Sequence, residues 1–332
     1  MANKSHWPRR LLSIPLFSLL FFALTILLVP LSVLALLFDL VCWGLKQKSA
    51  VLRMLGVIWS YLAAEVVGVL ALAGAWVFAG VGPKRSERLF HQTAIIQQSW
   101  AGFLLWAVQH IYRMEVQVEG QEQVAPGPIL VFIRHSSMVD TMLPVAFISK
   151  QQNIILRYVL KRELLWDPCI DIAGQRLRNY FVDRQNANRE EEFAQIASLA
   201  QGMSASEGTI IYPEGTRFSA RKLASIQEKL RGTPDGEWAQ QLHCTLPPKL
   251  GGVQALLDAA PEADVVFMAH YGLELASHWS SIWQGALLDQ TISLKFWRVS
   301  RAQIPVDKEL RKQWMHQQWL VLDQWVLSKH SH

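Results

Sequence analysis

The chain has 332 residues, of which 51% are hydrophobic and 18% charged, with 14 Trp and 14 Phe. This composition excludes a disordered chain, and the length excludes a disulfide-stapled miniprotein. Only 3 cysteines occur, with no C-x-x-C pair, so neither a disulfide framework nor a cysteine-based zinc site is expected. The net charge of +5 suits anionic lipid, a phosphorylated substrate or nucleic acid alike, so charge alone selects no partner.

Two long apolar runs occupy residues 1–82. Leu11 to Phe38 contains 28 residues without a charge, more than the roughly 20 that cross a hydrocarbon core. Met54 to Gly82 is interrupted only by Glu65, which in a bilayer would face a partner helix or a cavity, or carry a proton. Two spans with a short connection predict a transmembrane helical hairpin that returns the chain to its starting side.

Some alternatives stay open for this hairpin. Pro15 and Pro30 favour a kinked, tilted or re-entrant first helix over a simple crossing. A secretory signal peptide would explain the basic residues before the first run, although that run is far too long for one. Basic residues are equally numerous before, between and after the runs, so charge gives no orientation.

Residues 83–114 join the membrane region to the rest of the chain. Apolar residues follow helical spacing from Ile95 to Ile111. This pattern predicts an amphipathic helix that faces the protein core. Trp100 and Trp106 favour the alternative, a helix on the membrane surface.

Residues 115–306 alternate between strand-like and helix-like stretches, which predicts an α/β fold with a mixed sheet flanked by helices. The expected strands are 115–119, 129–133, 153–159, 180–183, 209–212, 264–268 and 292–299. The expected helices are 141–149, 189–206, 220–231 and 253–260. Residues 307–332 predict a C-terminal amphipathic helix, which docks on the domain or, through its tryptophans, anchors in lipid.

The first candidate site is the H-x-x-x-x-D spacing of His135 and Asp140, directly after an expected buried strand. Five positions apart, the two side chains do not share a face of a regular helix, so they can meet only across a strand-to-helix turn. There the imidazole could take a proton from a hydroxyl while the carboxylate holds the other ring nitrogen. The alternative is an ordinary helix start, with Ser137 as cap and Asp140 near the positive end of the helix.

The second candidate site is the loop Tyr212 to Arg217, where an expected strand ends in Pro-Glu-Gly-Thr-Arg. Gly215 lets the backbone approach a ligand closely, Thr216 offers a hydroxyl, and Arg217 offers a planar fork suited to phosphate. The loop therefore predicts an anion-binding site. In the alternative, an ordinary turn, Glu214 and Arg217 pair with each other.

Together these motifs resemble the glycerolipid acyltransferase family, which includes the lysophosphatidic acid acyltransferases. The resemblance covers roughly residues 115–270 and rests on four elements in the family's order: His135 with Asp140, the segment Lys161-Arg162-Glu163-Leu164, Gly174 followed by Tyr180-Phe181-Val182-Asp183-Arg184, and Tyr212-Pro213-Glu214-Gly215-Thr216-Arg217. Arg134 departs from the Asn that commonly precedes the motif histidine. The apolar strand 265–269 lacks the usual Pro, so the acceptor stays open among lysolipids.

The resemblance implies a membrane-bound O-acyltransferase with a particular set of site residues. His135 would be the general base and Asp140 its orienting partner. The acceptor would be held by Arg184, Glu214, Gly215, Thr216, Arg217 and, as a phosphate contact, Lys161. No metal and no cofactor is implied.

The implied donor is acyl-CoA or acyl carrier protein, and the implied acceptor is a lysophospholipid, most simply lysophosphatidic acid. Because both donors are cytoplasmic, the catalytic domain is expected to face that side, at the inner membrane in a bacterium. Membrane lipid, but no nucleic acid, is an expected partner. Open alternatives are a lysophosphatidylinositol-like or lysocardiolipin-like acceptor, a hydrolase, and a non-catalytic protein that only binds lipid.

Overall fold

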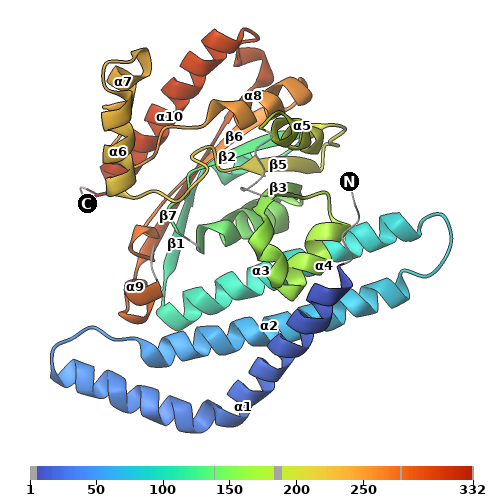
Figure 1. The fold of residues 1–332 in the computed structure, drawn as a ribbon, viewed down its shortest axis with the longest axis vertical. Coiled ribbons are helices and arrows are strands. Elements are labelled where there is room, and N and C mark those ends of the chain that lie inside the picture. Colours follow the sequence, from blue (N-terminus) through green and yellow to red (C-terminus); the bar gives the residue numbers. More distant parts are fainter. Residues whose placement is uncertain (1–5, 138, 183–188, 277–278, 331–332) are drawn as a thin grey trace. The chain divides into compact units, whose positions relative to one another are not determined.

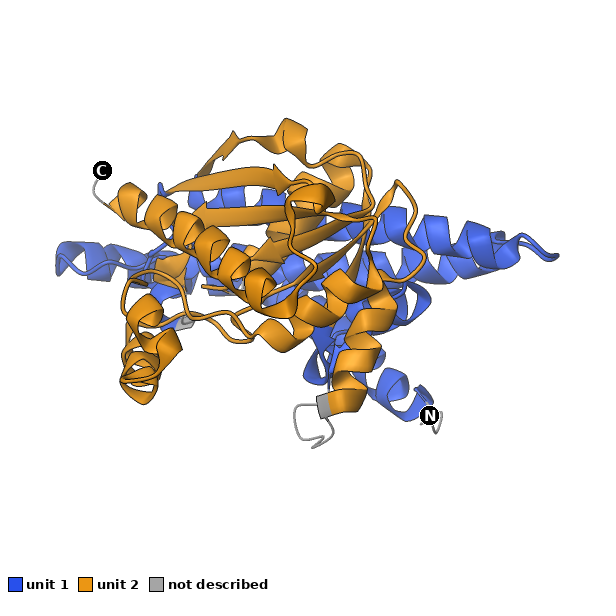
Figure 2. Ribbon diagram, turned by 90° about the horizontal axis from the view of Figure 1, so that it is seen from above, with its two compact units in different colours: residues 1–114, 160–185, 278–290 blue, residues 115–159, 186–277, 291–332 orange. Residues whose placement is uncertain are grey.

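The computed structural model describes residues 6–137, 139–182, 189–276 and 279–330. The chain folds into two compact units, coloured separately in Figure 2. The first comprises residues 1–114, 160–185 and 278–290, and the second comprises residues 115–159, 186–277 and 291–332.

The first unit is built mainly of helices. They are α1 (Trp7–Gly44), α2 (Val51–Phe78), α3 (Arg85–Tyr112), α4 (Pro168–Arg176) and the short α9 (Trp279–Trp283). The strand β4 (Tyr180–Val182) also belongs to this unit. The helix α2 packs against both α1 and α3, and α4 contacts all three.

The helices α1 and α2 contain the two predicted apolar runs, and both are long and apolar enough to cross a membrane. Only 6% of the apolar window of α1 is buried, unlike a core helix of a soluble protein, which hides its apolar side chains. Figure 1 shows α1 bending along its length, and Pro15 and Pro30 lie inside it. A proline lacks the N–H of the helical ladder, so the kinked first helix expected from the sequence has its physical cause here.

A set of buried polar contacts fixes the start of α4 in this unit. Glu65 of α2 is only 1% exposed, and its Oε2 accepts from the backbone N–H of Cys169 at 3.1 Å. Tyr61 donates to Asp167, which caps α4 by accepting from the N–H of Ile170. Of the roles that the sequence left open for Glu65, facing a partner helix is thus the one observed.

A mixed sheet of seven strands forms the framework of the fold, in the order β1-β7-β6-β2-β5-β3-β4 (Figure 1). Besides β4, its strands are β1 (Glu115–Glu119), β2 (Ile129–Ile133), β3 (Ile155–Lys161), β5 (Glu207–Ile211), β6 (Asp264–Tyr271) and β7 (Thr291–Val299). The pairs β1–β7, β2–β5, β2–β6 and β3–β5 are parallel, and β6–β7 is antiparallel. The predicted mixed α/β sheet is confirmed.

The helices of the second unit are α5 (Arg189–Ala200), α6 (Ala220–Leu230), α7 (Pro234–Ala239), α8 (Leu250–Ala259) and α10 (Lys308–His330). The C-terminal helix α10 docks on its own unit through the fully buried Trp319, whose Nε1 donates to the carbonyl of Leu246 at 2.9 Å. Of the two placements that the sequence left open for this helix, docking on the domain is the one observed.

The predicted helix 141–149 is wrong in kind. A 3-10 turn (Val139–Met142) and a short π-helix (Val145–Lys150) stand there instead. Pro144 lies between the two turns, and a proline supplies no N–H to a helical ladder.

Candidate active site

The candidate site forms where three parallel strands end. The strand β2 is buried at every residue and pairs in parallel with β5 on one side and β6 on the other. The carboxyl ends of these strands therefore lie at one edge of the sheet, the place where open α/β sheets bind ligands. His135 follows β2, the loop Tyr212–Arg217 follows β5, and His270 lies near the end of β6.

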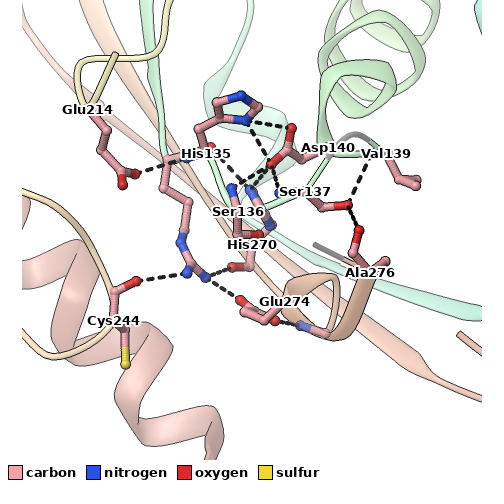
Figure 3. Close-up of polar contacts among 12 residues, drawn as sticks. His135, Ser136, Ser137, Val139, Asp140, Glu214, Cys244, His270, Glu274 and Ala276 are labelled. Atoms are coloured by element: carbon pink, nitrogen blue, oxygen red, sulfur yellow. Dashed lines mark hydrogen bonds and ion pairs between the residues drawn. The ribbon is translucent and has the colours of Figure 1, made fainter. Parts of the chain in front are cut away.

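His135 and Asp140 meet as the sequence predicted, across the turn after β2. Nδ1 of His135 lies 3.1 Å from Oδ1 and 3.2 Å from Oδ2 of Asp140. The carboxylate is fully buried, whereas the histidine side chain is 16% exposed. Because a carboxylate oxygen accepts, Nδ1 carries the hydrogen and Nε2 is left as the acceptor nitrogen of the neutral ring. Figure 3 shows this second nitrogen pointing away from Asp140.

The capping alternative describes part of the same geometry. Oδ2 of Asp140 accepts from the backbone N–H of Ser136 at 2.7 Å and of Ser137 at 2.8 Å. Oγ of Ser137 accepts from the N–H of Val139 at 3.1 Å. The same carboxylate of Asp140 thus orders the turn and contacts the imidazole of His135. Its hydrogen bonds from the backbone N–H groups of Ser136 and Ser137 help to orient it toward His135.

Glu214 links the two sequence motifs. Its Oε1 accepts from the backbone N–H of His135 at 2.9 Å, and its Oε2 accepts from the N–H of Leu246 at 3.1 Å. Burial raises the pKa of Glu214 to about 8, while nearby Arg134 and the two backbone hydrogen bonds act to lower it. Both carboxyl oxygens of the residue predicted to hold the acceptor are therefore directed at the backbone.

The loop after Glu214 carries the half-buried residues Thr216 and Arg217, and two lysines lie beside it. Gly215 has a φ of +67°, a left-handed conformation that favours glycine. Lys222 of α6 donates from Nζ to Oγ1 of Thr216 at 3.0 Å and to the carbonyl of Arg217 at 2.7 Å. A Cβ added at Gly215 would lie 2.9 Å from Nζ of Lys249, so a second ammonium group stands beside this loop.

Arg134 and His270 form a buried layer beneath the pair, and beyond the replaced Asn no pattern in the sequence indicates it. The Arg134 guanidinium, fully buried, donates to the carbonyls of His270 at 2.7 Å and Cys244 at 2.8 Å, and it pairs with Glu274. The His270 ring lies 3.1 Å from the carbonyl of Arg134. These contacts join positions up to 140 residues apart, which no local pattern can reveal.

The remaining predicted residues are Lys161 and Arg184. Lys161 is the last residue of β3 and belongs to the first compact unit, and Arg184 lies outside the described residues. The glycine at position 174, in the same motif as Arg184, is explained by packing, because an added Cβ would lie 2.6 Å from the ring of Phe181. Within the described part of the chain, no group of three His, Cys, Asp or Glu side chains is placed to hold a metal.

Comparison with known proteins agrees with this geometry. The model of the family described as Acyltransferase matches residues 115–267, a segment that contains His135, Asp140 and the whole loop to Arg217. A 1-acyl-sn-glycerol-3-phosphate acyltransferase of Pseudomonas aeruginosa is 27% identical over 134 residues, 40% of this chain and 49% of the relative. The similarity thus spans about half the length of that relative.

The fold also matches a solved structure. The crystal structure of the 1-acyl-sn-glycerophosphate (LPA) acyltransferase PlsC from Thermotoga maritima aligns with a TM-score of 0.54 at 16% identity. The alignment covers 84% of this chain and 97% of that one, so it extends beyond the sheet unit to the N-terminal helices. The segment 115–267, whose histidine and aspartate are in contact, thus matches the acyltransferase family.

Proposed function

We propose that the protein moves a fatty acyl group from a thioester donor to the free hydroxyl of a lysophospholipid, most simply lysophosphatidic acid, giving phosphatidic acid. The observation that carries this proposal is the contact of His135 Nδ1 with both carboxyl oxygens of Asp140, at 3.1 and 3.2 Å. The name of the Pseudomonas relative, a 1-acyl-sn-glycerol-3-phosphate acyltransferase, supports the choice of acceptor.

His135 acts in this proposal as the general base. Its Nε2 takes the proton of the acceptor hydroxyl while that oxygen attacks the thioester carbonyl carbon. A C–O bond forms, the C–S bond breaks with its electron pair passing to sulfur, and the thiolate then takes the proton from His135. Asp140 stays ionised throughout, keeps the hydrogen on Nδ1 and stabilises the transient imidazolium. A thioester is already activated, so no covalent enzyme intermediate is required.

The acceptor phosphate binds at the loop Gly215–Arg217. Arg217 offers a planar fork and Thr216 a hydroxyl, a combination suited to the oxygens of a phosphomonoester. Glu214 supports this loop by holding the backbone of His135 and Leu246. Lys161 and Arg184 enter the proposal through the family resemblance, as further phosphate contacts.

The helices α1 and α2 anchor the protein in the membrane that supplies the acceptor. Large apolar side chains of α1 are exposed, among them Ile26 at 79% and Val29 at 74%. Lipid is the environment in which such a surface is stable. Acyl-CoA and acyl carrier protein are cytoplasmic, so the proposal places the catalytic unit on the cytoplasmic side.

Mass spectrometry of the products tests the proposal. The purified full chain receives acyl-CoA and acyl carrier protein thioesters of mixed chain length, together with a panel of lysolipids. We expect phosphatidic acid to form, and only when lysophosphatidic acid is present. Preference for a diester headgroup would overturn the proposed acceptor, fatty acid release without lysolipid would indicate a hydrolase, and lipid binding without turnover would indicate a non-catalytic protein.

A further inference from the structure

A second histidine, His270 of β6, lies against the carboxylate of the candidate pair. Its Nε2 is 3.6 Å from Oδ2 of Asp140 and 3.1 Å from the carbonyl oxygen of Arg134. The ring is fully buried. Figure 3 shows His270 and His135 approaching Asp140 from different directions.

The contact with the carbonyl fixes the position of the hydrogen on this ring. A carbonyl oxygen only accepts, so Nε2 of His270 must carry the hydrogen. Burial and the nearby Arg134 guanidinium lower the pKa of His270, while Asp140 and Glu274 act to raise it. The ring is therefore neutral, and it presents an N–H dipole to the side of Asp140.

Arg134 and His270 also bind each other twice. The guanidinium of Arg134 donates to the carbonyl of His270, and the ring of His270 donates to the carbonyl of Arg134. This reciprocal clamp joins the end of β2 to β6 immediately before His135. The next two backbone N–H groups, those of Ser136 and Ser137, hold Oδ2 of Asp140.

A histidine at this position is unfavourable for stability, because its polar ring is buried among apolar residues. Every β6 residue from Val265 to Ala269 is apolar and fully buried. Within the described part of the chain, Nδ1 of His270 is buried without a hydrogen-bond partner. A buried unpaired polar atom destabilises the folded state, so an apolar residue would serve packing better.

We infer that His270 is a positioning residue for the proposed acyl transfer: its Nε2–H donates to the carbonyl of Arg134, directly before His135, and its N–H dipole, 3.6 Å from Oδ2 of Asp140, adds to the backbone N–H groups of Ser136 and Ser137 in holding the carboxylate facing His135. The inference rests on the proposed function for its catalytic consequence. The ring touches no substrate, and it acts through Asp140 and through the backbone before His135.

Two amide substitutions test this role because they differ by a single methylene group. His270→Gln places an amide N–H near the position of Nε2, whereas His270→Asn holds the same group too short to reach it. We expect the Asn variant to lose about 10- to 100-fold in kcat, the range that a misplaced catalytic group causes, with KM for the lysolipid nearly unchanged. We expect the Gln variant to recover most of kcat.

Equal kcat in the two variants, or a loss confined to KM, would overturn the inference. Melting curves accompany both variants, and His270→Ala, which also lacks the donor, replaces the Asn variant should that one fail to fold. His270→Met is close to Gln in size but has no N–H, so we expect it to lose kcat as the Asn variant does; rescue by Met as well as by Gln would show that the residue only fills space and would overturn the inference.

A second readout needs no substrate and separates this inference from the proposed function. Diethyl pyrocarbonate modifies neutral imidazole, and mass spectrometry measures how fast the reagent modifies the partly exposed His135. We expect slower modification of His135 in the Asn variant and a rate near that of the unsubstituted protein in the Gln variant. Equal rates in all three would overturn the inference, whereas absence of acyl transfer in the unsubstituted protein would overturn only the proposed function.

Discussion

Glu214 accepts a hydrogen bond from the backbone N–H of His135 at 2.9 Å, although the two residues stand 79 positions apart. Its second oxygen accepts from Leu246 at 3.1 Å. One buried carboxyl therefore ties the turn after β2, the loop after β5 and the segment before α8 together. The geometry of the candidate pair depends on this link.

Glu214→Gln should destabilise the protein and reduce turnover. Both carboxyl oxygens can accept whether the group is protonated or ionised, but an amide NH2 would face one backbone N–H and leave it unpaired. A buried unpaired donor costs about 1–3 kcal/mol. Melting curves check this against Glu262→Gln, an exposed glutamate before β6. Equal melting temperatures for the two variants would contradict the linking role.

Asp140→Asn should leave the fold intact and lower kcat by about 10²–10⁴-fold. The amide oxygen can keep the hydrogen bonds from Ser136 and Ser137, which places the NH2 group opposite Nδ1 of His135. Nδ1 must then accept, and the hydrogen moves to Nε2, the atom that would take the proton. Steady-state kinetics and a melting curve on the same preparation test this, and a fully active variant would show that Asp140 does not set the tautomer.

Gly215→Ala should cost more activity than its effect on stability explains. Both Gly215 and Gly202 have left-handed backbones, with φ of +67° and +59°, so alanine strains each by about 1–2 kcal/mol. Only at Gly215 would the new Cβ meet Lys249, since nothing lies within 4 Å at Gly202. We expect similar melting temperatures, and a raised KM for the lysolipid only in Gly215→Ala. Equal KM values for the Gly215→Ala and Gly202→Ala variants would show that the position of Lys249 beside the loop does not affect acceptor binding.

The buried His270 should make stability sensitive to mild acid. Burial and Arg134 lower the pKa of His270 in the folded protein, against the raising effects of Asp140 and Glu274. As pH falls below the unfolded value of about 6.5, the unfolded chain takes up a proton that the folded chain refuses, so stability falls by up to about 1.4 kcal/mol per pH unit. Melting temperatures between pH 7.5 and 5 should therefore fall less steeply for His270→Gln, and identical slopes would refute this.

Most helices and strands could be predicted from the sequence, because each shows a hydrophobic pattern over a short stretch of residues. The expected strands at residues 115–119 and 129–133 appear with those bounds, since polar–apolar alternation in the first and a short apolar run in the second are both typical of strands. The long apolar helices and the α10 helix were equally visible. The short α4, α7 and α9 were missed, because helices of 5 to 9 residues contain too few turns to show a period.

The candidate pair could be predicted, but its support could not. His135 and Asp140 are five positions apart, and the strand before them fixes where the chain turns. The Arg134–His270 clamp joins β2 to β6, and only the pairing of those strands brings the residues together. The expectation for Glu214 as an acceptor contact came from its motif. Its backbone partner at Leu246 depends on the long connection through α6 and α7.

The most direct test of the account is single-turnover acyl transfer by the full chain and its His135→Ala variant. Both are reconstituted in vesicles that contain lysophosphatidic acid, and vesicle flotation measures membrane binding alongside product formation. We predict that the variant floats with the vesicles as the unsubstituted protein does but forms no phosphatidic acid above the uncatalysed rate. Phosphatidic acid formed by His135→Ala at the rate of the unsubstituted protein would contradict the proposal that His135 takes the proton of the acceptor hydroxyl.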